Sequence, residues 1–143
     1  MSFWMLYYHL VWGMKNREHI ITEEREALIR QSIRASCEQH KVLIHGIGMM
    51  PDHLHLAVSI PPTCTIADIV RYFKGSSTHL INKSRESRVV DTFGWQREYG
   101  ALSFGERSLN EIVAYVENQK QHHADDKLWS LFEQLERPYT PTS

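Results

Sequence analysis

The run from His53 to Ile60 most constrains the fold, because its side chains alternate in character. One set of positions is apolar throughout (Leu54, Leu56, Val58 and Ile60), and the positions between them hold a mixed set (His53, His55, Ala57 and Ser59). A period of two is typical of a half-buried β-strand. We therefore predict a strand with an apolar inner face and two histidines that point away from the core.

The spacing of His53 and His55 allows both imidazoles to reach one metal ion. Alternate alpha carbons of a strand lie roughly 6.5 to 7 Å apart, and a ring nitrogen binds a metal at about 2 Å. A pair of ordinary surface histidines explains the same motif. The motif therefore predicts a metal site only if other residues supply the remaining ligands and the chemistry.

The order of the predicted elements defines the fold class. Predicted strands cover 3–12, 42–50, 53–60 and 93–104. Predicted helices run from a Thr22 cap to about 39, over 65–83 with Thr65 or Thr63 as the cap, and from a Ser108 cap onward. The first strand is apolar on both faces and is predicted to be central. The order β-α-β-β-α-β predicts an α+β, ferredoxin-like or RRM-like four-stranded antiparallel sheet. Two helices cover one face, the other face is expected to be open to a ligand, and an additional C-terminal helix follows.

Length and composition indicate one domain, predicted over 1–137, with a C-terminal tail over 138–143. A chain of 143 residues with 42% hydrophobic residues can bury a core without disulfides. Cys37 and Cys64 are far apart and form no metal-binding or disulfide pattern, which favours a reduced, intracellular setting. No segment has the length of a membrane span and no leader is recognisable, so we expect a cytoplasmic protein without a membrane partner.

The charge distribution indicates a local rather than a global nucleic-acid interface. The formal net charge is -1, which argues against a partner held by bulk positive charge. Between residues 71 and 97, however, the sequence contains six basic residues and only two acidic ones. We predict phosphate contacts by Arg71 and Lys74 in this stretch, and by Lys15 and Arg17 after the first strand. A solvated basic face remains the alternative.

The last predicted helix carries a polar edge beside its apolar stripe. Tyr115, Gln119 and His122 follow each other at helical spacing. Half-buried packing explains a tyrosine at such a position. Tyr115 and Gln119 become candidates for a reactive site only together with His53 and His55. An amide oxygen of Gln119 can complete the shell of Mg²⁺ or Mn²⁺. Tyr115 could then attack a phosphodiester whose developing charge the ion offsets.

Several motifs together resemble a known family, the single-tyrosine HUH transposases of bacterial insertion sequences and the REP-associated tyrosine transposases. The resemblance covers roughly residues 3–123. It includes Tyr-His-Leu-Val-Trp at 8–12, Lys-Asn-Arg at 15–17, Met-Pro-Asp-His-Leu-His-Leu at 50–56, Lys-Gly-Ser-Ser at 74–77, Trp-Gln at 95–96, Tyr-Gly-Ala at 99–101, Tyr-Val-Glu-Asn-Gln at 115–119 and His-His at 122–123. The Met-Pro-Asp-His-x-His block with a later Tyr-x-x-x-Gln helix is the specific combination.

The resemblance implies a transposase that nicks and rejoins single-stranded DNA at the ends of insertion elements. His53, His55 and Gln119 would bind Mg²⁺ or Mn²⁺, and Tyr115 would form a covalent 5′-phosphotyrosine. The substrate would be single-stranded DNA with hairpin element ends, in a bacterial or archaeal cell, at the nucleoid. The family also implies a homodimer with composite active sites, in which the last helix delivers its tyrosine to the other subunit.

Other functions remain open at this point. The chain could be a domesticated relative that binds hairpin DNA without transposition, or a metal-dependent phosphodiester hydrolase in which Tyr115 only orients the substrate. An RRM-like RNA binder would need stacking aromatics on its central strands where His53 and His55 stand. His122 and His123 have no assigned role, since a solvated helix histidine explains His122 as well as a phosphate contact does.

Overall fold

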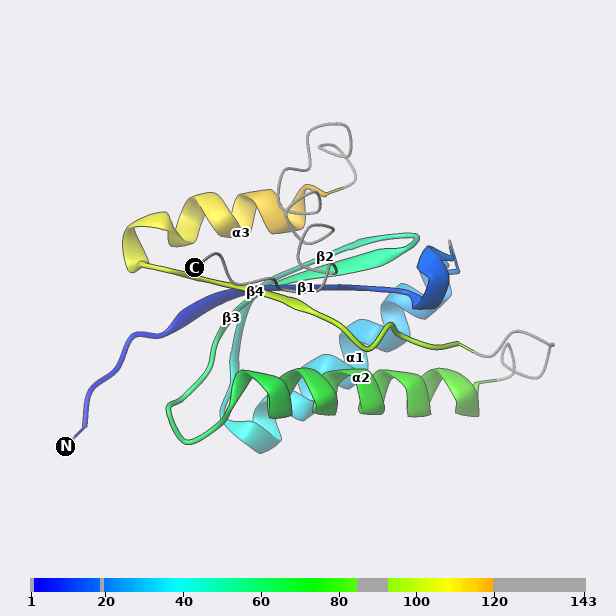
Figure 1. Cartoon of the computed structure of the whole chain (residues 1–143), viewed down its shortest axis with the longest axis horizontal. Coiled ribbons are helices and arrows are strands. Elements are labelled where there is room, and N and C mark those ends of the chain that lie inside the picture. Colours follow the sequence, from blue (N-terminus) through cyan, green and yellow to red (C-terminus); the bar gives the residue numbers. More distant parts are fainter. Residues whose placement is uncertain (1, 19, 85–92, 120–143) are drawn as a thin grey trace, which may run out of the picture.

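The computed structural model of the chain describes residues 2–18, 20–84 and 93–119. Its elements are β1 (Tyr7–Gly13), α1 (Glu23–His40), β2 (Leu43–Met50), β3 (His53–Ser59), α2 (Ile66–Lys83), β4 (Gly100–Phe104) and α3 (Leu109–Glu117), with short 3-10 turns at Lys15–Arg17 and Glu106–Ser108. The four strands form one antiparallel sheet in the order β2-β3-β1-β4. The helices α1 and α2 lie on one face and α3 on the other (Figure 1). The predicted α+β, ferredoxin-like architecture with an added C-terminal helix is confirmed.

The two long helices begin where the sequence predicts. The Thr22 hydroxyl accepts a hydrogen bond from the Arg25 amide at 3.2 Å, and the Thr65 hydroxyl accepts one from the Asp68 amide at 3.1 Å. Each threonine thereby satisfies a backbone donor that the first helical turn leaves unpaired. Both helices then pack on the apolar face of β3, where Leu54, Leu56 and Val58 are fully buried.

The strand β1 is central, as predicted, but it begins at Tyr7 rather than at Phe3. It pairs with β3 on one side and with β4 on the other. Tyr7 lies opposite Ser59 and Phe104, which are the last residues of those two strands. Residues 2–6 therefore lie beyond the ends of both partner strands, and Phe3 is 85% exposed. The prediction followed apolar density, which does not reveal where the partner strands end.

The predicted fourth strand over 93–104 is also shortened, to Gly100–Phe104. The Lys74 ammonium donates hydrogen bonds to the carbonyl oxygens of Gln96, Arg97 and Glu98, at 2.8, 3.1 and 3.0 Å. Carbonyls that turn toward one ammonium group cannot alternate along a strand ladder. Residues 96–98 therefore form a turn around Lys74, and Trp95 before this turn makes only an isolated antiparallel bridge with Met14.

The sheet face that was expected to be open is covered by α3, which lies over β2 and β3. The reason is an unusually close approach, because a Cβ atom built on Gly48 would lie 1.7 Å from the Val116 carbonyl oxygen. Val116 is fully buried in this contact. The Ser108 side chain makes no capping hydrogen bond, so packing on the sheet holds this helix more than its cap does. Among the described residues, no helix is both long and apolar enough to cross a membrane.

Candidate active site

The histidine pair lies on the β3 face that α3 covers, and it is buried. His53 is 1% exposed and His55 is fully buried. The alternation predicted for β3 is confirmed, since Leu54 and Leu56 lie in the core on the opposite face. The imidazoles point away from that core, as expected, but into a closed interface between sheet and helix rather than into solvent.

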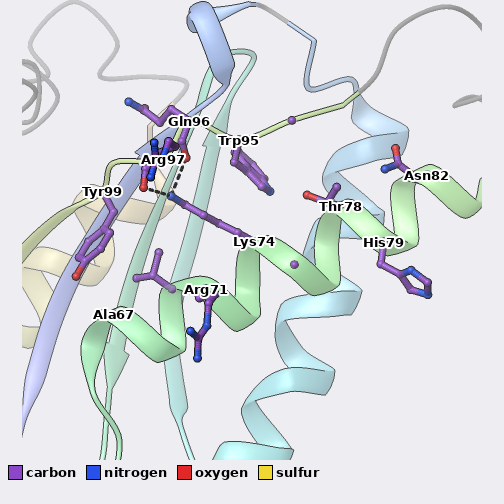
Figure 2. A pocket seen from close by; sticks show the side chains of 13 residues that line it. Ala67, Arg71, Lys74, Thr78, His79, Asn82, Trp95, Gln96, Arg97 and Tyr99 are labelled. Atoms are coloured by element: carbon purple, nitrogen blue, oxygen red, sulfur yellow. Dashed lines mark hydrogen bonds between the residues drawn. The ribbon is translucent and has the colours of Figure 1, made fainter.

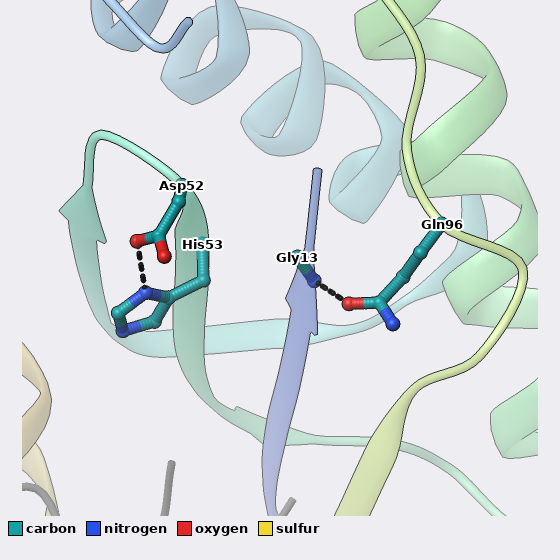
Figure 3. A network of polar contacts seen from close by, with 4 residues as sticks. All are labelled: Gly13, Asp52, His53 and Gln96. Atoms are coloured by element: carbon teal, nitrogen blue, oxygen red, sulfur yellow. Dashed lines mark hydrogen bonds and ion pairs between the residues drawn. The ribbon is translucent and has the colours of Figure 1, made fainter. Parts of the chain in front are cut away.

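The His53 ring is fixed by its sequence neighbour. Its Nδ1 atom lies 2.7 Å from Oδ1 of Asp52, whose side chain is 14% exposed (Figure 3). An ionised carboxylate can only accept a hydrogen bond, so Nδ1 carries the proton in a neutral His53 ring. Nε2 then carries the lone pair and is the atom that could bind a metal ion, as in histidine ligands whose other ring nitrogen donates to a carboxylate.

The His55 ring is fixed by a third histidine, from the neighbouring strand β1. The Nε2 atom of His9 lies 2.8 Å from Nδ1 of His55, and His9 is 1% exposed. The sequence interpretation used His9 only as part of a family motif and gave it no role. Its position could have been found only from the β1–β3 register, in which Val11 pairs with His55 and His9 pairs with Ala57.

The helix α3 brings Tyr115 to the histidines of its own chain. The Tyr115 ring lies edge-on to His9 and to His55, with ring centroids 5.9 Å apart in both cases. Gln119 follows the end of the helix, is 1% exposed and donates from Nε2 to the Tyr115 carbonyl at 2.9 Å. The structure thus brings together residues that are sixty positions apart in the sequence.

Of two glycines on β2 that face this helix, one allows its close approach to the sheet. Gly48, which pairs with His55 across the strands, allows the Val116 backbone and the Gln119 side chain to approach the sheet directly. At Gly46 the helix is farther away, and an added Cβ would meet only side-chain atoms at 3.4 Å or more. Gly48 therefore sets the depth of α3, while Gly46 does not. Sequence reasoning missed the role of Gly48 because a glycine has no side chain that contributes to a hydrophobic pattern.

The donor set of the site suits a divalent ion through Gln119 rather than through a cluster of acids. Within the described ranges, no three His, Cys, Asp or Glu side chains are arranged to hold a metal ion. The Oε1 atom of Gln119 is buried and has no hydrogen-bond partner among the described residues. A buried acceptor without a partner costs stability unless a ligand satisfies it. In such a mixed donor set, the amide oxygen is the kind of ligand that Mg²⁺ and Mn²⁺ prefer, and imidazoles are the kind that other first-row metals prefer.

The predicted phosphate-binding residues fall into two separate places. Lys15 and Arg17 line a depression of about 430 Å³ beside the end of β1. Asn16 and Arg17 have φ angles of 57° and 52°, a left-handed conformation that is uncommon for residues other than glycine. Because Gly13 pairs with His53, this turn lies at the His53 end of the sheet.

Arg71 and Lys74 line a groove of about 830 Å³ between α2 and residues 94–99 (Figure 2). Arg71 is exposed and pairs with Asp68 at 3.0 Å, a contact that solvent screens. Lys74 is occupied by its three carbonyl contacts, and burial lowers the pKa of its ammonium group to about 8. Lys74 therefore shapes the 96–98 turn, and its phosphate contact stays a prediction. His122 and His123 lie outside the described residues, as do residues 120–143.

Comparison with known proteins identifies a family for the chain. A family model described as "Transposase IS200 like" matches residues 2–119. The chain is 28% identical over 119 residues to the ISDra2 transposase TnpA of Deinococcus radiodurans, which covers 81% of this chain and 85% of that protein. It is 26% identical over 139 residues to the transposase for insertion sequence element IS200 of Salmonella typhimurium, with coverage of 95% and 87%.

Two solved structures share the fold. One, from Deinococcus radiodurans, has a TM-score of 0.65 at 24% identity and covers 83% of this chain and 95% of its own. The other, a REP-associated tyrosine transposase bound to a REP hairpin, has a TM-score of 0.62 at 15% identity and covers 99% and 89%. The family model, which matches most of the chain, assigns the protein to the class of transposases. The chain belongs to the IS200-like transposase family, which confirms the resemblance seen in its sequence.

Proposed function

We propose that the protein nicks and rejoins single-stranded DNA at the ends of an insertion element, with Tyr115 as the nucleophile and a divalent ion held by His53, His55 and Gln119. The observation that carries the proposal is the placement of Tyr115 against His55, together with a buried Gln119 amide that is hydrogen-bonded to the Tyr115 carbonyl. A structural core would gain more from apolar side chains at these positions. The family and the named relatives support the same function.

Each residue has a distinct part in the proposed reaction. The Tyr115 oxygen attacks phosphorus and gives its proton to a base or water, and the bond from phosphorus to the 3′ oxygen of the preceding nucleotide breaks. That oxygen leaves and takes up a proton as a free 3′-hydroxyl, and the DNA remains attached to Tyr115 through its 5′-phosphate. A bound Mg²⁺ or Mn²⁺ would act as a Lewis acid toward a phosphate oxygen. Attack of a 3′-hydroxyl on the phosphotyrosine reverses the step and joins strands without an external energy source.

The substrate in this proposal is DNA with hairpin ends, as suggested by the REP hairpin bound to the structural relative. The turn over Lys15–Arg17 lies at the His53 end of the sheet and supplies positive charge there. We assign phosphate contacts to Lys15 and Arg17 next to the site and to Arg71 on the groove of α2. A cytoplasmic location at the nucleoid belongs to the same proposal.

The test uses single-stranded oligonucleotides that carry the palindromes flanking the gene, labelled at either end, with Mg²⁺ or Mn²⁺. The intact protein should release the 5′-labelled fragment and retain the 3′-labelled fragment covalently in a denaturing gel. Tyr115→Phe should lose both cleavage and the covalent band, and His53→Ala should lose cleavage while it still binds the hairpin. Cleavage by Tyr115→Phe would favour a hydrolase, and hairpin binding without cleavage by the intact protein would favour a domesticated binder.

A second experiment asks whether Tyr115 acts within its own chain or on a partner. The structure places Tyr115 beside the His55 of its own chain, whereas the family resemblance implies delivery to a second subunit. Tyr115→Phe and His53→Ala proteins, each inactive, are mixed under conditions that allow subunit exchange. Restored cleavage would show a composite site in a homodimer, since only a mixed dimer then combines one intact tyrosine with one intact histidine pair. A mixture that stays inactive supports the arrangement seen within one chain.

A further inference from the structure

His9 is a buried polar residue that contacts a proposed metal ligand and has no place in the reaction described above. It lies on β1, on the sheet face under α3, and is 1% exposed. Its Nε2 atom is 2.8 Å from Nδ1 of His55, and the two rings are tilted by 52° with centroids 5.1 Å apart. We propose that His9 is a positioning residue that holds His55 in the tautomer and orientation in which His55 Nε2 binds the metal ion. The inference rests on the proposed function.

The hydrogen bond between the two histidines has a direction that metal binding would fix. A neutral imidazole has one N–H donor and one acceptor nitrogen. If Nε2 of His55 binds a metal, that atom carries a lone pair, and the proton of His55 must sit on Nδ1. His9 must then accept this proton's hydrogen bond through an unprotonated Nε2. The opposite direction, with His9 as donor, would put the proton of His55 on Nε2 and block the ligand atom.

The two proposed histidine ligands are therefore supported by different groups. His53 donates from Nδ1 to the carboxylate of Asp52, and His55 donates from Nδ1 to the imidazole of His9. Partners of this kind fix the ring orientation of metal-binding histidines, and their loss typically lowers metal affinity about 10- to 100-fold. A neutral imidazole orients His55 without a second negative charge in a buried site, where an added charge would be costly.

The contact with Tyr115 adds a second reason to assign His9 to the site. The His9 and Tyr115 rings lie edge to face at 64°, with centroids 5.9 Å apart. His9 therefore touches the proposed nucleophile and one proposed ligand at the same time. A side chain that only filled space between β1 and α3 could be apolar, as the neighbouring Val11 is.

The experiment compares His9→Phe, which fills the space without an acceptor, with His9→Gln, whose amide oxygen can accept from His55 Nδ1. The readout is Mn²⁺ affinity, measured by electron paramagnetic resonance titration of the full chain without DNA. His9→Phe should bind Mn²⁺ about 10- to 100-fold more weakly, His9→Gln should keep most of the affinity, and His53→Ala should lose binding. Thermal unfolding of each variant verifies that it is folded.

The outcomes separate this inference from the proposed function. If the intact chain binds Mn²⁺ and His53→Ala does not, but folded His9→Phe binds like the intact chain, then His9 is not a positioning residue and the metal site stands. Equal loss in His9→Phe and His9→Gln would also overturn the role of the acceptor. If the intact chain binds no Mn²⁺, the proposed metal site fails, and the inference fails with it.

A second measurement reads the tautomers directly and needs no metal. Nitrogen-15 NMR of labelled histidines in the intact chain should show the His55 proton on Nδ1 and an unprotonated Nε2 in His9. In His9→Phe, the His55 ring should no longer be held in the Nδ1 tautomer. A His55 that carries its proton on Nε2 in the intact chain would refute the proposed direction of the hydrogen bond.

Discussion

The substitution Gly48→Ala tests whether the depth of α3 on the sheet controls the site. The added Cβ would lie 1.7 Å from the Val116 carbonyl oxygen and 2.8 Å from the carbonyl carbon, whereas real Cβ atoms essentially never come within 3.0 Å of such atoms. The obstacle is helix backbone, which cannot rotate away as a side chain can. The helix must retreat by more than 1 Å, and it carries Tyr115 and Gln119 with it.

The expected effect is large for activity and moderate for stability. A displacement of about 1 Å in a catalytic group can cost about 100-fold in rate, so we expect nicking to fall by at least that factor. Overpacking typically costs about 1 to 3 kcal/mol, which should appear as a lower midpoint in thermal unfolding. The nicking rate is measured under single-turnover conditions on the labelled oligonucleotides described above.

Gly46→Ala is the matched control, because it adds the same methyl group to the same strand and the same face. Its Cβ would contact side-chain atoms of Val113 and Glu117 at 3.4 Å, and these can adjust. Replacement of a glycine in a strand also reduces the conformational freedom of the unfolded chain, so stability should be unchanged or slightly higher. Equal nicking rates for both variants would refute the conclusion that Gly48 sets the position of α3.

Two further predictions concern titratable groups outside the site. Lys74 has a pKa of about 8 in the folded protein, against an ordinary value of 10.5. Between these pH values the unfolded chain binds more protons than the folded chain, so the free energy of unfolding should rise with pH. Urea titrations across this pH range should show a smaller rise for Lys74→Met. Burial raises the pKa of the Cys37 thiol to about 12. Iodoacetamide at mildly alkaline pH should therefore label only the partly exposed Cys64 in the folded protein, and should label Cys37 after urea is added. Rapid labelling of folded Cys64→Ser, in which Cys37 is the remaining cysteine, would contradict this prediction.

The sequence is sufficient for the parts of the fold that local chemistry determines. The alternation from His53 to Ser59 specifies both the strand and its two faces, and the threonines at 22 and 65 specify where the long helices begin. These signals lie within a few residues of the structure they determine. The topology then follows from the order of elements, because few arrangements of four strands and two helices bury every apolar face.

The predicted starts of the first and fourth strands were wrong, because residues distant in the sequence determine where these strands begin. Phe3 to Leu6 have strand-like composition, but β3 and β4 end opposite Tyr7. Residues 96–98 lie between two strand-like stretches, but the Lys74 ammonium draws their carbonyls out of the ladder. A side chain on a helix 22 to 24 residues earlier thus ends a strand, and no local pattern contains that information.

The proposed reactive residues could be found from the sequence, whereas the residues that support them could not. His53, His55, Tyr115 and Gln119 are chemically distinctive, and their spacing on strand and helix places them on common edges. The roles of His9 and Gly48 depend instead on interstrand register, because each becomes significant only where it lies beside His55. One supports the ring and the other removes a side chain from the path of the helix.

The burial of the site also argues that its residues were not selected for stability. The Gln119 amide oxygen lies in a closed interface without a hydrogen-bond partner among the described residues, a state that costs about 1 to 3 kcal/mol. Leucine there would bury similar volume without that cost. A short helix such as α3 has little intrinsic stability to offset this cost. Its packing on the sheet therefore depends on the close approach of its backbone at Gly48. The chain therefore combines a stabilising contact of the helix backbone with a destabilising polar cluster beside it, and a bound metal ion that satisfied the amide oxygen would tighten the same interface.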